Sequence, residues 1–172
     1  PVREAIRQLE LEGLVQLVPN KGAFVTGISE KDVRDIYLIR ARLEGLAARM
    51  AAKNITPELL DAMEETVVLS KEHYEQVCEM DSKFHKLLYK ASGSRILEHT
   101  LTDFHQYVQR VRMASIMKKR RMEKSNDEHD AILTAIREHD EEKAELVATR
   151  HISNTVENLK NYDLDSVLSK GE

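Results

Sequence analysis

The chain has 172 residues and a formal net charge of −4, and this length suits one ordinary domain with a small appendage. Hydrophobic residues make up 41 % and charged residues 33 % of the chain, which is typical of a globular protein and excludes a disordered one. Its 6 Gly and 3 Pro are too few for a sandwich or barrel with frequent turns. We therefore expect a mostly helical, all-α fold.

No stretch of about 18 uncharged apolar residues occurs, so we expect no membrane span. The start of the chain lacks a signal-peptide pattern, and the single cysteine, Cys78, cannot form an internal disulfide. These features predict a cytoplasmic location. Because Pro1 already lies in the first turn of a helical pattern, we expect the chain to begin within a longer protein.

The first 28 residues predict a helix followed by a β-hairpin. Apolar residues recur at helical spacing over residues 2–12, and Gly13 is a typical helix stop. Two short β-prone runs then flank a turn at residues 19–22 that contains Asn and Gly. A helix and a hairpin bury too little to form a core alone, so this segment is interpreted as the end of a small module.

The rest of the chain is predicted to form a helical bundle. Ser29 begins a capping pattern, and Thr56-Pro57 combines an N-cap with proline at the first helical position. Ser125–Glu128 resembles a capping box, and Asp140 is expected to cap the last helix. Short connections between about six helices indicate an antiparallel bundle. The expected helices are residues 31–52, 57–72, 75–92, 94–117, 125–138 and 141–160.

Four residues on three of these helices form a candidate metal site. Asp81 and His85 are four residues apart, so both side chains project from one helix face. His129 lies early in the next-to-last helix and His151 lies midway along the last one. Imidazole and carboxylate ligands suit Zn²⁺, and also Ni²⁺, Mn²⁺ or Fe²⁺. Four protein ligands leave open positions on a metal that accepts five or six, where a small acid can bind.

Other interpretations of the histidines stay open at this point. A single His on a helix is more often solvated or satisfied by a neighbour than bound to a metal. Spacing alone does not exclude His73, His99 or His105 from such a site, and His139 is assigned to a helix junction beside Asp140.

Basic residues of the first 28 positions suggest a nucleic-acid contact. Arg3 and Arg7 are four residues apart on a polar face of the first helix, and Lys21 lies at the hairpin tip. Ordinary surface ion pairing is the alternative, since Glu4 and Glu10 are each three residues from Arg7. Acidic and basic residues balance in this segment, so charge alone does not indicate DNA binding. The basic run 118–121 is interpreted as a solvated loop.

The order of the segments resembles GntR-type transcription regulators of the FadR-like branch. The segment PVREAIRQLELEGLVQLVPNKGAFVTGIS resembles the second half of their winged helix-turn-helix, which is a recognition helix with a hairpin wing. The first helix of their ligand-sensing FCD domain resembles ISEKDVRDIYLIRARLEGLAARMAA. The D-x-x-x-H signature of that domain is similar to DSKFHKLLYKASG, and its closing helices resemble EHDAILTAIREHDEEKAELVATRHI.

This resemblance implies roles for individual residues. Asp81, His85, His129 and His151 match the metal-ligand positions of the family, and Arg40 matches an Arg near its effector pocket. Arg3 and Arg7 match recognition-helix arginines, Gly22 matches the wing-tip glycine, and Lys21 stands beside it. The resemblance further implies small carboxylic-acid effectors and homodimers on operator DNA. The first two helices of the winged helix-turn-helix are absent, so we expect this chain alone to dock on DNA poorly.

The resulting hypothesis is a ligand-responsive DNA-binding transcription regulator, not an enzyme. Its expected domains are a partial winged helix-turn-helix at 1–28, a metal- and effector-binding helical domain at 29–160, and a polar tail at 161–172. The sequence shows no phosphate-binding Gly loop, nucleophile elbow or CxxC motif. A metal-dependent phosphohydrolase of the HD type is the alternative, because His129-Asp130 is an HD dipeptide. A third hypothesis is a helical bundle that only mediates dimerisation.

Overall fold

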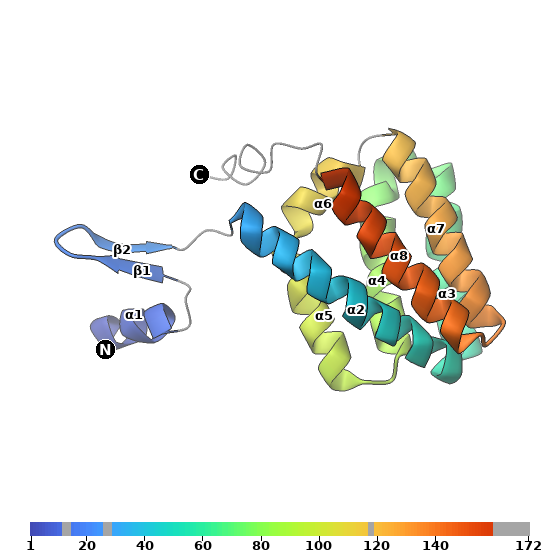
Figure 1. Cartoon of the computed structure of the whole chain (residues 1–172), viewed down its shortest axis with the longest axis horizontal. Coiled ribbons are helices and arrows are strands. Elements are labelled where there is room, and N and C mark those ends of the chain that lie inside the picture. Colours follow the sequence, from blue (N-terminus) through green and yellow to red (C-terminus); the bar gives the residue numbers. More distant parts are fainter. Residues whose placement is uncertain (12–14, 26–28, 117–118, 160–172) are drawn as a thin grey trace.

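The structure of the protein, a computed structural model, describes residues 1–11, 15–25, 29–116 and 119–159. Its elements divide into a small N-terminal module and a helical domain (Figure 1). The module contains α1 (Val2–Leu11), β1 (Val15–Val18) and β2 (Gly22–Val25). The helical domain contains α2 (Glu30–Asn54), α3 (Pro57–Glu72), the 3-10 helix η1 (Tyr74–Gln76), α4 (Val77–Ala91), α5 (Arg95–Tyr107), α6 (Gln109–Ile116), α7 (Lys119–Arg137) and α8 (Glu141–Leu159).

The N-terminal module has the predicted helix and hairpin. β1 and β2 are antiparallel, with Val15 opposite Val25 and Val18 opposite Gly22. Gly22 has a φ of +110°, in the region that favours glycine, which explains its place at the end of the turn. None of the α1 residues is buried. Gly13, the predicted helix stop, lies outside the described residues.

The long helix α2 runs beside α8 along one face of the helical domain (Figure 1). It begins at the predicted capping box, where the Ser29 side chain accepts from Asp32 N and the Asp32 side chain accepts from Ser29 N. Gly45 permits the close approach of the two helices. A Cβ at this position would lie 2.2 Å from Thr149 Oγ1 and 3.1 Å from the Glu145 carbonyl oxygen.

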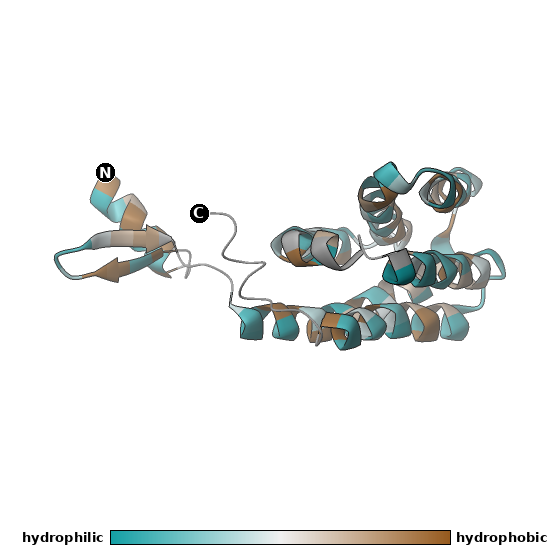
Figure 2. Cartoon of the chain, turned by 90° about the horizontal axis from the view of Figure 1, so that it is seen from above, coloured by the Kyte–Doolittle hydropathy of each residue, from teal (hydrophilic) through white to brown (hydrophobic). Residues whose placement is uncertain are grey.

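Two large apolar clusters and a small one around Val77 and Met122 hold the described helices together. Figure 2 shows the helical domain from above, to one side of the module. Phe84, Leu88, Ile132 and Ile136 lie in the larger cluster with the alanines of α2. The smaller cluster joins the start of α2 to α6 and the end of α8, through Val33, Tyr37, Val108, Val111, Ile152 and Leu159. Within the described ranges, no helix has the length and hydropathy needed to cross a bilayer.

Helix boundaries differ from the sequence prediction at two places, and the described helical domain has seven α-helices instead of about six. The predicted helix 94–117 is interrupted at Val108, which has φ −96° and ψ 7° and is buried in the smaller cluster. The predicted start at residue 125 is wrong, because α7 already begins at Lys119. Both changes arise from tertiary packing: Ser125 is buried, and the Ser70 hydroxyl donates to Asn126 Oδ1 at 2.7 Å.

Candidate metal centre

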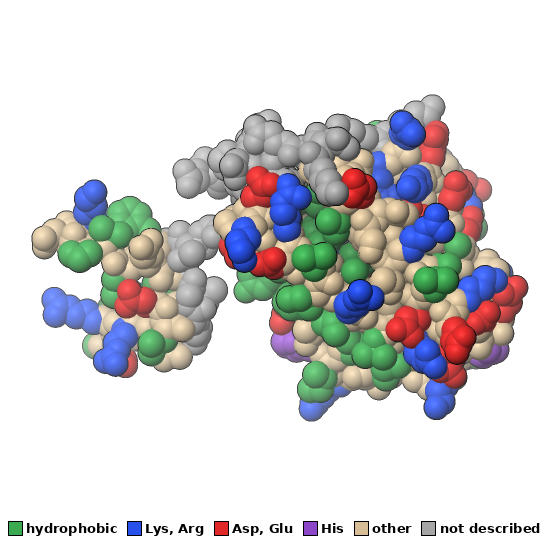
Figure 3. Space-filling model, viewed as in Figure 1, with side chains coloured by type: hydrophobic (Ala, Val, Ile, Leu, Met, Phe, Trp, Pro, Cys, Tyr) green, Lys and Arg blue, Asp and Glu red, His purple; other side chains and the backbone are tan. Residues whose placement is uncertain are grey.

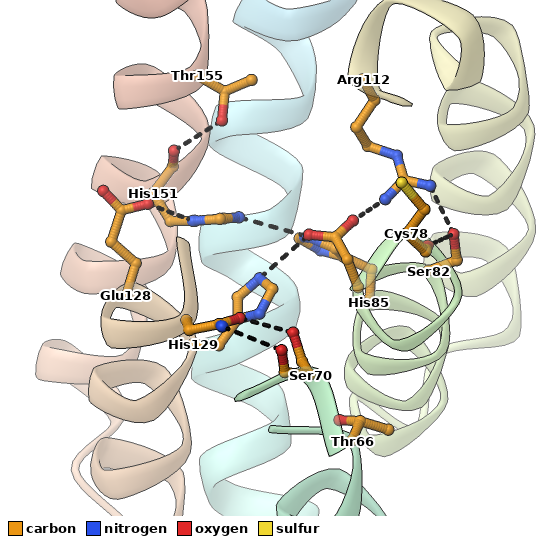
Figure 4. Close-up of polar contacts among 12 residues, drawn as sticks. Thr66, Ser70, Cys78, Ser82, His85, Arg112, Glu128, His129, His151 and Thr155 are labelled. Carbon is orange, nitrogen blue, oxygen red and sulfur yellow. Dashed lines mark hydrogen bonds and ion pairs between the residues drawn. The ribbon is translucent and has the colours of Figure 1, made fainter. Parts of the chain in front are cut away.

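Three histidines from three helices meet inside the helical domain (Figure 4). His85 comes from α4, His129 from α7 and His151 from α8, and one nitrogen of each lies within 4.8 Å of the others. All three side chains are at most 3 % exposed. Among the described residues, no other group of His, Cys, Asp or Glu meets in this way. The structure therefore brings together three of the four predicted metal ligands.

Two carboxylates set the orientation of two of these rings. Glu44 Oε2 lies 2.8 Å from His85 Nδ1, and Glu128 Oε2 lies 2.7 Å from His151 Nδ1. A carboxylate beside Nδ1 favours the neutral tautomer that carries its proton there, which leaves Nε2 with a lone pair. The Nε2 atoms of His85 and His151 face each other at 3.4 Å (Figure 4). Two lone pairs at this separation require a proton or a cation between them.

Burial disfavours a proton as the bridge between these two nitrogens. It lowers the pKa of His151 to about 4, although Glu128 acts in the opposite direction. Burial, with the neighbouring His151 and His85, also holds the pKa of His129 well below its usual value. At neutral pH His129 and His151 are therefore neutral imidazoles, the form that binds metals.

The geometry of the cluster fits a metal ion. Two nitrogens bound to one zinc ion at about 2.0–2.1 Å in tetrahedral geometry lie about 3.3 Å apart, close to the 3.4 Å between His85 and His151. His129 is held by its ring, which stacks on Phe84 with centroids 4.1 Å apart. Its Nε2 is buried and has no hydrogen-bond partner within the described part of the chain.

Asp81, the fourth predicted ligand, lies at the edge of the cluster. Its Oδ1 is 3.7 Å from His129 Nε2, and its Oδ2 forms an ion pair with Arg112 of α6. Asp81 is buried, one helical turn before His85. One oxygen thus faces the histidines while the other faces an arginine.

Arg40, the predicted effector residue, is completely buried beside Glu44. Its Nε donates to Glu44 Oε1 at 3.0 Å, and the Tyr89 hydroxyl donates to the same oxygen at 2.8 Å. Burial acts to raise the pKa of Glu44, but Arg40 and His85 outweigh it and hold that pKa well below its usual range. Arg40 therefore supports the carboxylate that orients His85.

The sequence analysis did not place Glu44 or Glu128 at the candidate metal site. Glu44 stands four residues after Arg40, a spacing that signals a helical ion pair but not a contact with His85. Arg121, predicted to be solvated in the basic run, is buried instead: it donates to Glu128 Oε2 and to Thr155 Oγ1, both at 2.8 Å. The contact with His151, and after it that with Arg121, outweighs burial and lowers the pKa of Glu128 to about 2.

The remaining histidines do not join the cluster. His73 and His99 pair with acidic residues at the surface, and His139 Nδ1 lies 2.7 Å from the Ala52 carbonyl. His105 is buried with its ring centroid 5.6 Å from that of His85, and within the described ranges its nitrogens have no partner. Asp130, the second residue of the HD dipeptide, forms a half-exposed ion pair with Lys71 and is therefore no ligand beside His129.

A small cavity adjoins the histidines. It has a volume of about 20 Å³, enough for about one water molecule. Its lining includes Tyr37, Arg40, Asp81, His85, Arg112 and His151. A larger pocket of about 260 Å³ lies between α7 and α8, and the His151 side chain contributes to both.

The predicted DNA-binding residues lie apart from this centre, in the N-terminal module. Arg3, Arg7, Lys21 and Gly22 are all exposed, and basic side chains project from the module in Figure 3. The Leu17 backbone N donates to Glu10 Oε1 at 3.2 Å, which ties the helix to the hairpin. The arginines are therefore presented on a helix that the wing supports.

Comparisons with known proteins identify relatives of the chain. Residues 35–154 match the FCD domain. The HTH-type transcriptional repressor RspR of Escherichia coli is 28 % identical over 93 % of this chain and 72 % of its own length. The HTH-type transcriptional regulator YdhC of Bacillus subtilis is also 28 % identical, over 93 % and 74 %.

Solved structures show the same fold. The Streptococcus agalactiae GntR structure has a TM-score of 0.65 and 22 % identity, and the match covers 91 % of this chain and 80 % of that one. The E. coli McbR/YncC structure has a TM-score of 0.72 and 18 % identity, with 93 % and 84 % covered.

Proposed function

Because this chain belongs to the FCD-domain transcriptional regulators of the GntR type, we propose that its helical domain binds a divalent transition metal and a small carboxylic-acid effector. The metal ligands in this proposal are His85, His129 and His151, with Asp81 as the fourth. Zinc is the first candidate metal, and Ni²⁺, Mn²⁺ and Fe²⁺ use similar ligands. The relatives are transcriptional regulators, which gives the HD-type phosphohydrolase no support.

The observation that carries this proposal is the pair of facing Nε2 atoms of His85 and His151, 3.4 Å apart. Each ring has a carboxylate at Nδ1, from Glu44 and Glu128 respectively. Carboxylate–histidine pairs of this kind orient metal ligands and raise their basicity. A merely structural polar core has no reason to direct two lone pairs at one point.

A bound metal supplies an electrophilic centre for an effector carboxylate, and the protein supplies the position. Arg40 lines the adjoining cavity, where its second terminal nitrogen can donate a charge-assisted hydrogen bond. Glu44 and Glu128 lie beside the rings of His85 and His151, and burial keeps the imidazoles of His129 and His151 neutral.

In the same proposal, the effector modulates operator binding by a homodimer. Arg3 and Arg7 contact DNA from α1, and Lys21 with Gly22 approaches the phosphates from the hairpin. Their exposure supports this role. Effector binding biases the placement of the two DNA-contacting modules of the dimer.

Elemental analysis of the purified chain, before and after treatment with a chelator, tests the metal site. We expect about one transition metal per chain and a fall in melting temperature after chelation. His85→Ala should lose the metal and keep its helicity, whereas His99→Ala, a surface control, should retain it. An unchanged metal content in His85→Ala would remove His85 from the site. Absence of metal from the wild type, even after Zn²⁺, Ni²⁺ or Mn²⁺ is added, would refute the proposal.

A further inference from the structure

A second pocket, the α7–α8 pocket, lies between the two helices that close the described helical domain (Figure 1). Its volume of about 260 Å³ is close to the lower limit of about 300 Å³ for small-molecule sites. Each helix contributes residues three or four apart, which lie on one helix face. The lining residues are Lys124, Asp127, Glu128 and Ala131 from α7, and Val147, Arg150, His151 and Asn154 from α8.

The pocket is polar at one end and apolar at the other. A short turn around His139 joins α7 to α8, so residues at equal distances along the chain from this turn lie opposite one another. Lys124 is therefore opposite Asn154, and Ala131 is opposite Val147. The apolar end lies nearer the turn, and the charged residues lie in the middle and at the far end.

Glu128 is already occupied by the protein itself. Its side chain is 14 % exposed, and its Oε2 accepts from Arg121 and lies 2.7 Å from His151 Nδ1 (Figure 4). Its Oε1 accepts from Asn154 at 2.7 Å. This carboxylate therefore has no oxygen left for a ligand, and the charges available in the pocket are those of other residues.

Asp127 and Arg150 supply the available charges. Both side chains are exposed, and within the described ranges neither forms an ion pair or a side-chain hydrogen bond, with each other or with a third residue. Neighbouring charges on the same two helices are paired, such as Asp130 with Lys71 and Lys143 with Glu138. One acid and one base, nearly opposite each other across the pocket, match a ligand that carries both charges.

We propose that the α7–α8 pocket binds a small zwitterion, an α-amino acid with an apolar side chain. Its ammonium group pairs with Asp127 and its carboxylate with Arg150, in charge-assisted hydrogen bonds. Its side chain packs against Ala131 and Val147, which removes apolar surface from water. A simple acid would place its carboxylate near Asp127 without a compensating cation, and a simple amine would face Arg150. The site needs no metal, so a chain without metal leaves this proposal intact.

The probe is L-valine, and the purified chain is followed by backbone amide NMR during the titration. Signals of residues 124–131 and 147–154 should shift together and saturate. Isovalerate is valine without its amine, and isobutylamine is valine without its carboxylate. Each should bind at least threefold more weakly than valine, because each leaves one charge of the pocket without a partner.

Exposed positions of the pocket allow variants that keep the fold. Asp127→Asn and Arg150→Gln should each weaken valine binding by about threefold to tenfold, the range expected for partly exposed ion pairs. Ala131→Leu should abolish binding, because Ala131 is exposed and the larger side chain fills the apolar end without entering the core. Asp61→Asn on α3 and Arg95→Gln on α5 are the matched controls at exposed positions outside the pocket, and both should bind valine like the wild type.

Four results would overturn the proposal. The first is a wild type whose signals do not shift in a saturable way. The second is a set of shifts confined to the α2 residues beside the histidines, Tyr37 and Arg40, which would place valine in the small cavity instead. The third is binding of isovalerate or isobutylamine within twofold of valine, which would show that the pocket does not recognise both charges. The fourth is valine affinity within twofold of wild type in both Asp127→Asn and Arg150→Gln.

Discussion

Replacement of Glu44 by glutamine tests whether a buried carboxylate controls the metal-binding tautomer of His85. The glutamine amide can still accept from Arg40 and Tyr89, which now share Glu44 Oε1. Its NH₂ group then takes the place of Glu44 Oε2, which lies 2.8 Å from His85 Nδ1 in the wild type. Nδ1 must accept from that group, so the ring proton moves to Nε2. The lone pair that faces His151 is lost.

Two effects of known size follow from Glu44→Gln. Loss of a partner that orients a metal-binding histidine weakens metal affinity by about 10- to 100-fold. Arg40 is completely buried, and removal of one partner from a buried ion pair costs about 3–5 kcal/mol of folding free energy. Competition with a chromophoric chelator measures the affinity, and denaturant unfolding of the metal-free chain measures the stability.

The ring nitrogens of His85 provide the decisive measurement for Glu44→Gln. Nitrogen NMR of the metal-free chain should show the proton on Nδ1 in the wild type and on Nε2 in the variant. Glu138→Gln is the matched control, because Glu138 forms a surface ion pair with exposed Lys143. This variant should change neither the metal affinity nor the position of the His85 ring proton. A metal affinity within twofold of wild type, with stability reduced as expected, would refute the orienting role and leave Glu44 only as the partner of Arg40.

Two further predictions concern packing and pH. Gly45→Ala should destabilise the domain by about 1–3 kcal/mol, because its Cβ would overlap Thr149 Oγ1. When Thr149→Ala is added, denaturant unfolding should show that part of this loss is recovered. Fully additive changes in the free energy of unfolding in the double variant would contradict the overlap. Burial lowers the pKa of His105 to about 3 from its usual value of 6.5. The unfolded chain therefore binds more protons than the folded one between these values, and the free energy of unfolding falls as the pH drops through this window. His105→Leu should remove about 3 kcal/mol of this pH dependence in the metal-free chain, as measured by unfolding at pH 7 and pH 4. An unchanged pH dependence would contradict the assignment.

Local sequence signals predicted most of the fold. The Ser29 capping box, Thr56 before Pro57, and the turn that contains Gly22 all depend on contacts within a few residues, and each is present. The break at Val108 was not predicted, because that position has no Gly, Pro or capping residue. Val108 is instead fixed by burial against α2 and α8. Boundaries that depend on tertiary contacts are invisible to local periodicity.

The same distinction applies to the candidate site. The spacing of Asp81 and His85 identified one helix face, and the helical pattern made His129 and His151 candidates to join it. The family resemblance then favoured this set over the other histidines. Neither source identified Glu44, because its contact with His85 joins residues far apart in the chain. Arg112 was missed for the same reason, since its position beside Asp81 depends on the break before α6. The sequence thus identified the candidate metal ligands, and the structure identified the side chains that contact them.

α2 connects the two parts of the proposed mechanism. On one helix it carries Tyr37 and Arg40 at the cavity and Glu44 beside His85. It begins at Glu30, five residues after the hairpin ends at Val25. A ligand held between α2 and α6 acts on a helix that leads directly toward the N-terminal module. The energy available for such coupling is the difference in ligand affinity between two placements of α2. In this mechanism, effector contacts at the cavity beside α2 would bias the position of the residues proposed to contact DNA.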